Sequence, residues 1–144
     1  MTPDGASVYV ANVAGAAVSQ YDLGEGGALS PKVTPTVPTS QPQGVAIGAE
    51  GESAYVTNGD ASTVSRFGIG PDGSLTPQSP PTVAAGAEPG AVAASPDGRS
   101  VYVANFGGNS ISQYDVDSGG TLSPKNPPEV PLGVRPVDIA VSPD

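Results

Sequence analysis

The chain of 144 residues contains no cysteine, no histidine and no tryptophan. Without cysteine it has neither a disulfide framework nor a thiolate metal site. Without histidine it also lacks the commonest acid-base group and metal ligand of enzymes. These absences exclude most familiar active sites, and we expect neither a cofactor nor a metal ion.

Positive charge is also scarce, because 5 Lys and Arg stand against 14 Asp and Glu and give a net charge of -9. Such a charge repels phosphate backbones and anionic lipid surfaces, so we expect no nucleic-acid partner. Long apolar runs are missing as well. The stretch from Gly5 to Tyr21 is broken by Asn12, Ser19 and Gln20. It is therefore too polar to span a membrane.

The beginning of the chain shows no targeting pattern. Met1 is followed directly by Thr2, Pro3, Asp4 and Gly5, without a basic region or an apolar region. We therefore expect no signal peptide in this segment. The acidic, cysteine-free composition, rich in Ser, Thr and Pro, favours the cell envelope or secretion over the cytoplasm.

Glycine and proline are abundant and together make up 37 of the 144 residues. This level is typical of disorder only when no period organises the sequence. Here a unit about 47 residues long recurs three times, which predicts a folded repeat architecture. The landmarks are the tetrapeptides Tyr9–Asn12, Tyr55–Asn58 and Tyr102–Asn105, the glycines Gly5, Gly51 and Gly98, the leucines Leu29, Leu75 and Leu122, and the prolines Pro42, Pro89 and Pro136.

Four short apolar runs make up one unit. In the third repeat they cover residues 91–95, 100–105 and 109–116 and a segment from residue 121 onward. Ser95-Pro96-Asp97-Gly98, between the first two runs, is a strong hairpin signal. No run has helical periodicity over a useful length, so the sequence predicts an all-β fold of four-stranded antiparallel units.

Proline placement orients the unit. Ten of the 17 prolines fall in the fourth run, and proline is confined to edge strands and bulges. The fourth strand is therefore expected to be the exposed edge, and the Ala- and Val-rich first strand the buried one. Val101-Tyr102-Val103 is apolar on both faces, as in a sheet covered by neighbours on both sides. These features indicate β-propeller blades, and the alternative is a β-solenoid, whose coils are usually shorter.

As a propeller, the chain divides into a blade without its first strand at 1–39, blades at 40–86 and 87–133, and the first strand of a further blade at 134–144. Closed propellers have about four to eight blades, so three cannot close a ring. An unpaired inner strand is also an aggregation template. Either the parent polypeptide is longer, which we favour, or two chains form a homodimer that completes a six-bladed ring.

Several motifs resemble a known family. Tyr55-Val56-Thr57-Asn58 is the YVTN signature, and Ser95-Pro96-Asp97-Gly98 matches the segment that precedes it in YVTN-repeat propellers. The elements Gly73-Ser74-Leu75-Thr76-Pro77 and Gly120-Thr121-Leu122-Ser123-Pro124 resemble the lactonase-type branch of the family, which includes 6-phosphogluconolactonases. The resemblance covers the whole chain and implies part of a seven-bladed ring. For activity it implies hydrolysis of a sugar lactone, although the motifs themselves are blade scaffolding.

The second repeat departs from this pattern. It has Ala49-Glu50-Gly51-Glu52 in place of Ser-Pro-Asp-Gly, and Phe67-Gly68 in place of Tyr-Asp. We interpret these changes as drift in surface turns that leaves the fold intact.

Candidate site residues follow from the expected loops. In a propeller the loops from the fourth strand to the next first strand share one face with the loops from the second strand to the third. One interpretation of their polar groups is a ring around a lactone or sugar, with Glu88 or Asp60 positioning water and Arg135 binding an anionic group. The catalytic candidates are Asp60, Glu88 and Arg135, and the ligand-binding candidates are Asn12, Gln43, Asn58 and Asn105.

The other interpretation is structural. Each repeated asparagine would then satisfy local backbone groups or adopt a left-handed conformation, as asparagine commonly does in turns. We favour this for the asparagines, because a residue that recurs in every blade is better explained by blade geometry. Asp60, Glu88 and Arg135 do not recur and are expected to be solvated loop charges unless they form a site.

Two further patterns have structural explanations. The run Asp115-Val116-Asp117-Ser118-Gly119 resembles the opening of a calcium loop. Its ligand positions are not repeated and no bidentate glutamate follows, so we predict a turn without metal. One shared strand position holds Gln20, Arg66 and Gln113, which are expected to bond between blades, and the next position holds Tyr21, Phe67 and Tyr114, which are expected to pack there.

Two functions remain open. The main expectation is a non-catalytic propeller within a longer surface or envelope protein, presenting its loops to a protein or carbohydrate partner. The alternative is a lactone hydrolase, in which water attacks the carbonyl of a cyclic ester and the oxyanion is stabilised. The shortage of ionisable candidates in a chain without histidine favours the first.

Overall fold

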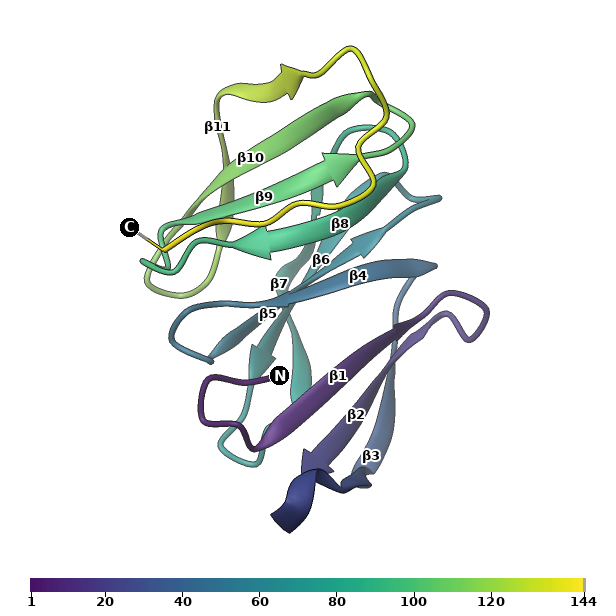
Figure 1. Cartoon of the computed structure of the whole chain (residues 1–144), viewed down its shortest axis with the longest axis vertical. Coiled ribbons are helices and arrows are strands. Elements are labelled where there is room, and N and C mark those ends of the chain that lie inside the picture. Colours follow the sequence, from purple (N-terminus) through teal and green to yellow (C-terminus); the bar gives the residue numbers. More distant parts are fainter. Residues whose placement is uncertain (144) are drawn as a thin grey trace.

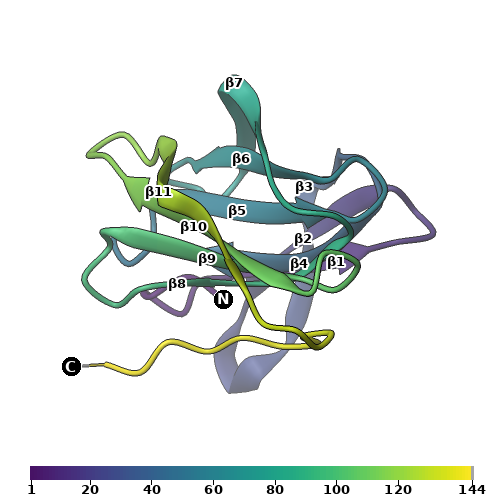
Figure 2. The same cartoon turned by 90° about the horizontal axis from the view of Figure 1, so that it is seen from above.

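Three antiparallel sheets make up the computed structural model, which describes residues 1–143. Figure 1 shows them stacked along the long axis of the molecule, and Figure 2 shows the same stack from above. The strand orders are β1-β2-β3, β4-β5-β6-β7 and β8-β9-β10-β11. The strands are β1 (Ser7–Asn12), β2 (Ala17–Leu23), β3 (Leu29–Pro38), β4 (Pro42–Ile47), β5 (Ser53–Asn58), β6 (Thr63–Ile69), β7 (Leu75–Ala84), β8 (Pro89–Ala94), β9 (Ser100–Asn105), β10 (Ser110–Val116) and β11 (Leu122–Pro131).

The sheets confirm the all-β prediction and correspond to about three propeller blades. Blade 1 (β1 to β3) lacks a first strand, whereas blade 2 (β4 to β7) and blade 3 (β8 to β11) have all four. In the described part of the chain the only helix is a short 3-10 helix, η1 (Glu25–Gly27). No helix in residues 1–143 is long and apolar enough to cross a membrane.

The fourth strand is exposed, as predicted, but the first strand is not the most buried one. β7 and β11 are mostly exposed, as their prolines predict. The buried strand is the second one rather than the first: all six residues of β5 are buried, whereas in β4 and β8 only the leading proline is. The reason is position, because a second strand has strands on both sides and sheets over both faces, while a first strand forms the inner edge of the blade.

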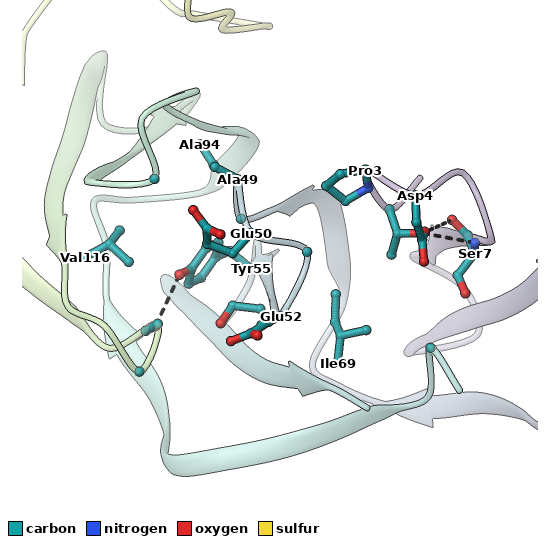
Figure 3. Close-up of a pocket in the computed structure, with 18 of the residues that line it drawn as sticks. Pro3, Asp4, Ser7, Ala49, Glu50, Glu52, Tyr55, Ile69, Ala94 and Val116 are labelled. Carbon is teal, nitrogen blue, oxygen red and sulfur yellow. Dashed lines mark hydrogen bonds between the residues drawn. The ribbon is translucent and has the colours of Figure 1, made fainter. Parts of the chain in front are cut away.

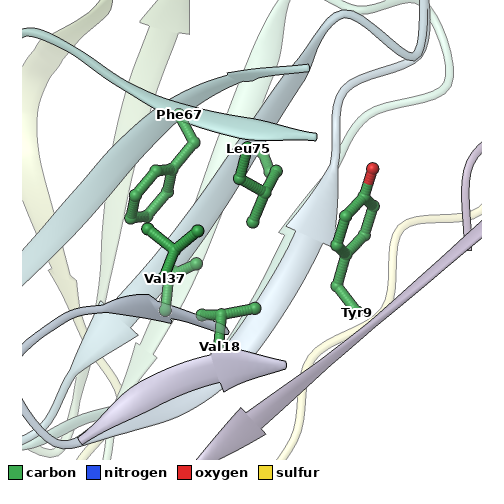
Figure 4. Close-up of a cluster of buried hydrophobic side chains, with 7 residues drawn as sticks. Tyr9, Val18, Val37, Phe67 and Leu75 are labelled. Carbon is green, nitrogen blue, oxygen red and sulfur yellow. The ribbon is translucent and has the colours of Figure 1, made fainter. Parts of the chain in front are cut away.

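The hydrophobic core lies between the blades. Tyr9, Val18 and Val37 of blade 1 pack against Phe67 and Leu75 of blade 2, as Figure 4 shows. A second cluster joins blades 2 and 3 in the same way and contains Tyr55, Val64, Val101, Val103, Tyr114 and Leu122. Each fully buried side chain of this size stabilises the fold by roughly 1.5–3 kcal/mol. The apolar character of both strand faces is therefore explained by neighbouring blades.

A bulge interrupts the pairing of the third and fourth strands in every blade. The register shifts between Ser65 and Phe67 in blade 2, so Arg66 has no partner in the ladder. Its guanidinium instead donates to the Pro80 carbonyl at 2.9 Å and to Gln78 Oε1 at 2.8 Å. The expected bonding between blades is therefore wrong for Arg66, since the side chain fills the bulge of its own blade.

The two glutamines at the same repeat position as Arg66 differ in whether they bond to another blade. Gln113 donates to the Pro127 carbonyl within blade 3 at 2.7 Å. Gln20 donates to the Thr34 carbonyl within blade 1 at 2.9 Å, and its Oε1 also accepts from Leu75 N of blade 2 at 2.7 Å. Bonding between blades is thus found at Gln20, where a following blade supplies the donor.

The segment after β11 carries no assigned strand up to residue 143. It runs along β8, as both views show (Figures 1 and 2). In blades 2 and 3 the first strand pairs with the second strand of the same blade, and the described residues after β11 hold no such second strand. The expected first strand of a further blade at 134–144 stays a prediction, and residue 144 lies outside the described residues.

Candidate functional site

Two types of loop meet on one face of the molecule. The Gly59 amide donates to the Gln41 carbonyl at 3.2 Å, and the Phe106 amide donates to the Glu88 carbonyl at 2.9 Å. Each bond ties a loop between second and third strands to the loop that enters the same blade. We call this surface the asparagine face, and it consists of loops 13–16, 39–41, 59–62, 85–88 and 106–109.

The repeated asparagines make the same contact in each blade. Their side-chain amide groups lie 2.7 Å from Ser19 Oγ for Asn12, 2.8 Å from Ser65 Oγ for Asn58 and 2.9 Å from Ser112 Oγ for Asn105. Asn58 and Asn105 are 1% and 0% exposed. The three amides therefore tie the second strand to the third, and those of Asn58 and Asn105 offer little surface to a ligand.

The left-handed backbone conformation that the structural interpretation allowed for the asparagines is not found. Asn12, Asn58 and Asn105 are not left-handed; positive φ occurs instead in the neighbouring loops, at Gln41 and Glu88 before the repeat prolines and at Ala16, Ser62 and Asn109 before the third strands. The strand-end asparagines act through their side chains, and the turns take up the strained backbone.

The other candidates are exposed on the asparagine face. Asp60 lies in loop 59–62, the Gln43 side chain lies against Gly59, and the Glu88 side chain lies against Gly107. The Arg135 guanidinium lies 5.0 Å from the centre of the Phe106 ring, within the range of a cation–π contact. Within residues 1–143 no hydrogen bond or ion pair joins Asp60, Glu88 and Arg135 to one another.

One relation among these residues escaped the sequence analysis. Gln41, Glu88 and Arg135 each precede a repeat proline, so they occupy a single position of the repeat with three different side chains. The proline landmarks were the signal that could have revealed it. This position therefore differs in charge from one repeat to the next.

A cavity of about 340 Å³ lies beside the inner strands β4 and β8. Its polar side chains are Gln43 and Asp138, and the remainder of its lining is Gly44, Val45, Gly90, Ala91, Val92 and Val137. Of the predicted site residues, only Gln43 reaches it. Its volume is at the lower end of that of small-molecule sites.

The opposite face carries a larger groove of about 1010 Å³, which the sequence analysis missed. It is formed by the turns between first and second strands and those between third and fourth strands. Figure 3 shows Glu50, Glu52 and Tyr55 in its middle part, between Val116 and Ile69. Its rim is acidic, and among the described lining residues the only basic one is Arg99.

Most carboxylates of this groove have structural roles. Asp97 accepts from Ser95 Oγ at 2.5 Å and from Arg99 N at 3.0 Å, and these bonds hold its pKa below the ordinary value. The Thr2 hydroxyl and the Ala6 amide lower the pKa of Asp4 in the same way. Backbone amides do so for the two remaining turn aspartates, Asp72 and Asp117. These groups stay ionised at neutral pH and stabilise turns.

The Asp117 contacts form a turn, as predicted for this segment. The carboxylate accepts from Gly119 N at 2.9 Å and Thr121 N at 2.8 Å. Within residues 1–143 no group of three or more acidic side chains is arranged to hold a metal ion.

Glu50 and Glu52 are exceptions in the groove, because neither carboxylate is bonded to another described residue, and Glu50 is the one at a position that is aspartate in the other repeats. It occupies the repeat position of Asp4 and Asp97, but its longer side chain makes no hydrogen bond or ion pair within residues 1–143. The substitution that looked like drift thus replaces a turn-stabilising carboxylate with a free one.

The arrangement of blades can now be compared with known proteins. The family model described as "Lactonase, 7-bladed beta-propeller" matches residues 1–143. The chain belongs to this lactonase family. No curated protein matches it by sequence.

Solved structures agree with this assignment in fold. A Bacteroides fragilis protein named as a candidate 6-phosphogluconolactonase is 23% identical, with a TM-score of 0.85 over 99% of this chain and 43% of its own. The periplasmic gluconolactonase of Pseudomonas aeruginosa is 26% identical, with a TM-score of 0.73 over 84% of this chain and 37% of its own. Hydrazine synthase of Kuenenia stuttgartiensis is 24% identical, with a TM-score of 0.75 over 96% of this chain and 36% of its own. This lactonase-family chain therefore spans about two fifths of the length of these proteins.

Proposed function

We propose that this chain is the three-blade part of a lactone hydrolase that acts on a sugar lactone. The observation that carries the proposal is the lactonase family match over residues 1–143, and the similarity to a gluconolactonase supports the substrate class. This reverses our preference from the sequence, which favoured a non-catalytic scaffold. The activity belongs to the complete ring, of which this chain contributes about three blades.

The reaction requires few groups. Water attacks the carbonyl carbon of the cyclic ester, the ring C–O bond breaks, and the ring oxygen takes up a proton to give the hydroxy acid. A base that positions the water and donors that stabilise the oxyanion are sufficient. On the asparagine face Glu88 or Asp60 would position the water, and Arg135 would bind an anionic substituent such as a phosphate.

The position of Glu88 supports its part in this proposal. Its loop enters β8, which lines the 340 Å³ cavity, and the equivalent repeat positions hold Gln41 and Arg135. Gly107 provides room for the side chain, because a Cβ at that position would lie 2.9 Å from the carboxyl carbon. The carboxylates of the larger groove on the opposite face are weaker candidates for the base. Four of them accept hydrogen bonds within their own turns.

Acid release from δ-gluconolactone in a pH-stat, with the spontaneous rate subtracted, tests the proposal on this chain and on the longer protein that holds the other blades. Loss of a general base should reduce the rate on the order of 10²- to 10⁴-fold in Glu88→Gln. Glu25→Gln is the matched control, because Glu25 is exposed on the opposite face. Arg135→Ala should raise KM for a phosphorylated lactone more than for the unphosphorylated one.

The proposal fails if neither protein accelerates hydrolysis, or if Glu88→Gln and Glu25→Gln behave alike. A second candidate, a non-catalytic scaffold for a protein or carbohydrate partner, is favoured by one observation: Asp60, Glu88 and Arg135 are all solvent-exposed, and a catalytic base is usually partly desolvated. Perturbed amide NMR signals in loops 39–41 and 85–88 on addition of gluconate, without hydrolysis, would support this candidate.

A location in the cell envelope or outside the cell is part of the proposal. It is supported by the acidic, cysteine-free composition and by the similarity to a periplasmic gluconolactonase. Fractionation of the source cells would test it.

A further inference from the structure

The first strands β4 and β8 each contain a bulge beside the cavity of about 340 Å³. In β4 the register shifts between Pro42 and Gly44, so Gln43 has no partner in the ladder. Bulges redirect side chains and are common next to binding sites. The Gln43 side chain lines the cavity and forms no hydrogen bond within residues 1–143. Its amide can therefore both donate to and accept from a molecule in the cavity.

Further blades would leave this cavity open. A first strand forms the inner edge of its blade, and in a closed ring the inner edges face the central channel rather than a neighbouring blade. The strands β4 and β8 lie side by side in both views (Figures 1 and 2). A Cβ at Gly44 would lie 2.8 Å from the Gly90 carbonyl oxygen, so the two strands are in close contact. The cavity thus lies where a seven-bladed ring has its channel.

Three residues at or next to the cavity wall depart from the other repeats, and all three belong to blade 2. They are Gln43 in place of Gly90 and Val137, Thr57 in place of Ala11 and Ala104, and Gly59 in place of Val13 and Phe106. A residue that recurs in every blade is explained by blade geometry, whereas these departures gather in one place. Their contacts show that they act together.

Gly59 leaves room for the Gln43 side chain. A Cβ at residue 59 would lie 3.0 Å from Gln43 Nε2 and 3.1 Å from Gln43 Cγ. Both distances are shorter than an ordinary van der Waals contact, so a valine or phenylalanine, as in the other repeats, would displace the amide. Gly59 and Gln43 are therefore a matched pair, a small residue beside a long side chain.

The Thr57 hydroxyl fixes the wall from which Gln43 projects. It accepts from Gly44 N at 2.9 Å and donates to the Gly90 carbonyl at 2.5 Å, so one side chain bonds to both first strands. Thr57 is fully buried. Alanine occupies this position in the other repeats and could make neither bond. The link between β4 and β8 is thus a property of blade 2, and it holds the bulge at Gln43 in place.

The composition of the wall indicates which kind of molecule the cavity would take. Apart from Gln43 and Asp138 the described lining residues are glycine, alanine and valine, and none of them is basic. A neutral amide exchanges hydrogen bonds with hydroxyl groups, and small apolar residues contact C–H groups. A volume of about 340 Å³ suits a single small ring. These features favour a neutral ring with several hydroxyls over a group that carries phosphate.

We propose that the cavity beside β4 and β8 holds the sugar ring of the lactone, and that Gln43 recognises its hydroxyl groups. The identity of the ligand rests on the proposed function, whereas the site rests on the cavity and on the contacts of blade 2. The Gln43 amide hydrogen-bonds adjacent ring hydroxyls, and the C–H groups of the ring lie on the glycine and valine wall. Gln43 thereby sets the preference for a hydroxylated lactone over a simple one.

Titration of the isotope-labelled chain with methyl glucoside, a neutral sugar ring without an ester, tests the site by NMR independently of hydrolysis. Shifts are expected in the side-chain amide of Gln43 and in the backbone amides of residues 44–45 and 90–92. Tetrahydropyran, which lacks hydroxyls, should leave these signals in place. Gln43→Ala should weaken binding about 2- to 10-fold, the factor that one neutral hydrogen bond contributes. Gln41→Ala is the matched control, because Gln41 is an exposed glutamine nearby that does not line the cavity.

A second variant moves the amide without removing it. Gly59→Ala should displace the Gln43 side chain and weaken the binding of methyl glucoside as well. Gly48→Ala is its control, since a Cβ there would meet nothing closer than 3.6 Å. In the pH-stat assay Gln43→Ala should raise KM for δ-gluconolactone and leave KM for δ-valerolactone, which has no hydroxyls, unchanged. Circular dichroism confirms that the variants fold.

The outcomes separate this site from the proposed activity. Absence of shifts at Gln43 with methyl glucoside, or equal affinities of the Gln43→Ala and Gln41→Ala chains, overturns the proposal. Binding at Gln43 without hydrolysis of any lactone supports the sugar site and refutes only the hydrolase. Hydrolysis with a KM for δ-gluconolactone that Gln43→Ala leaves unchanged supports the hydrolase and refutes the role of Gln43.

Discussion

The hydroxyl of Tyr9 lies 2.6 Å from the carbonyl oxygen of Gly73, and this bond crosses from the first blade to the second. The tyrosine belongs to the repeated tetrapeptide, and Tyr55 makes the equivalent bond to Gly120. Tyr9 and Tyr55 are 6% and 1% exposed. The signature tetrapeptide therefore stabilises the junction with the following blade as well as its own sheet.

Removing this hydroxyl should lower stability. We expect Tyr9→Phe to reduce the free energy of unfolding by about 0.5–1.5 kcal/mol, or somewhat more because the Gly73 carbonyl is left without its partner. Urea unfolding followed by circular dichroism measures the change at constant m-value. Tyr102→Phe is the matched control, because the Tyr102 hydroxyl makes no such bond to another blade within residues 1–143. An equal loss in both variants would contradict the assigned role.

The inner strands should not tolerate a side chain at Gly44. A Cβ there would lie 2.8 Å from the Gly90 carbonyl oxygen, so Gly44→Ala must push β4 and β8 apart. Overpacking of this kind costs about 1–3 kcal/mol. Gly15→Ala is the control, since its Cβ would meet nothing closer than 3.5 Å. Thermal unfolding of the two variants should differ by several degrees, and equal transition temperatures would show that the inner strands are not in close contact.

Acid should weaken the turns through their aspartates. The pKa of Asp97 is lowered in the folded chain by the Ser95 hydroxyl and the Arg99 amide, so its contribution is present above the unfolded pKa and is lost as the pH falls through the folded one. Asp97→Asn keeps an acceptor but removes the titration. We expect this variant to show a smaller loss of stability between pH 5 and pH 2 than the parent chain.

Glu50→Gln provides the comparison for Asp97→Asn. Glu50 holds the same repeat position without a bond in its turn, so the substitution should leave the stability near pH 7 unchanged. Urea midpoints measured across this pH range check both variants. A Glu50→Gln chain that loses as much stability as an Asp97→Ala chain would show that Glu50 stabilises its turn after all.

Alkaline pH should act through Tyr114. Burial raises its pKa to about 12, because the ionised phenolate is poorly solvated between the blades. In the unfolded chain a tyrosine titrates near pH 10. The favourable contribution of the neutral side chain is therefore complete below about pH 10 and is lost as the pH rises toward 12.

Absorbance near 295 nm follows this titration directly. Tyr114→Phe should remove a transition near pH 12. The stability of the variant should depend less on pH in this range. A single transition near pH 10 in the parent chain would show that Tyr114 is accessible to water.

The sequence predicted which loops form the asparagine face, but it did not predict the side-chain contacts within the candidate site. The asparagine face could be predicted, because strand order fixes which loops share a face. The role of Asn105 in bonding Ser112 could be guessed only in general terms, because the two residues meet across a strand pair. The free carboxylate of Glu50 was taken for drift, since only the structure shows that the equivalent aspartates stabilise their turns.

What the sequence by itself determined is the local and periodic part of this protein. Short apolar runs, turn glycines and prolines at fixed intervals specify four short strands per unit and place the fourth at the exposed edge, because proline cannot donate to a ladder. Repetition of the unit then specifies stacked blades. The tertiary structure alone decided which strand is most buried, where Arg66 bonds, and which residues meet at the cavity beside β4 and β8. Those properties depend on neighbouring blades, and contacts between distant parts of a chain are set by how the sheets pack.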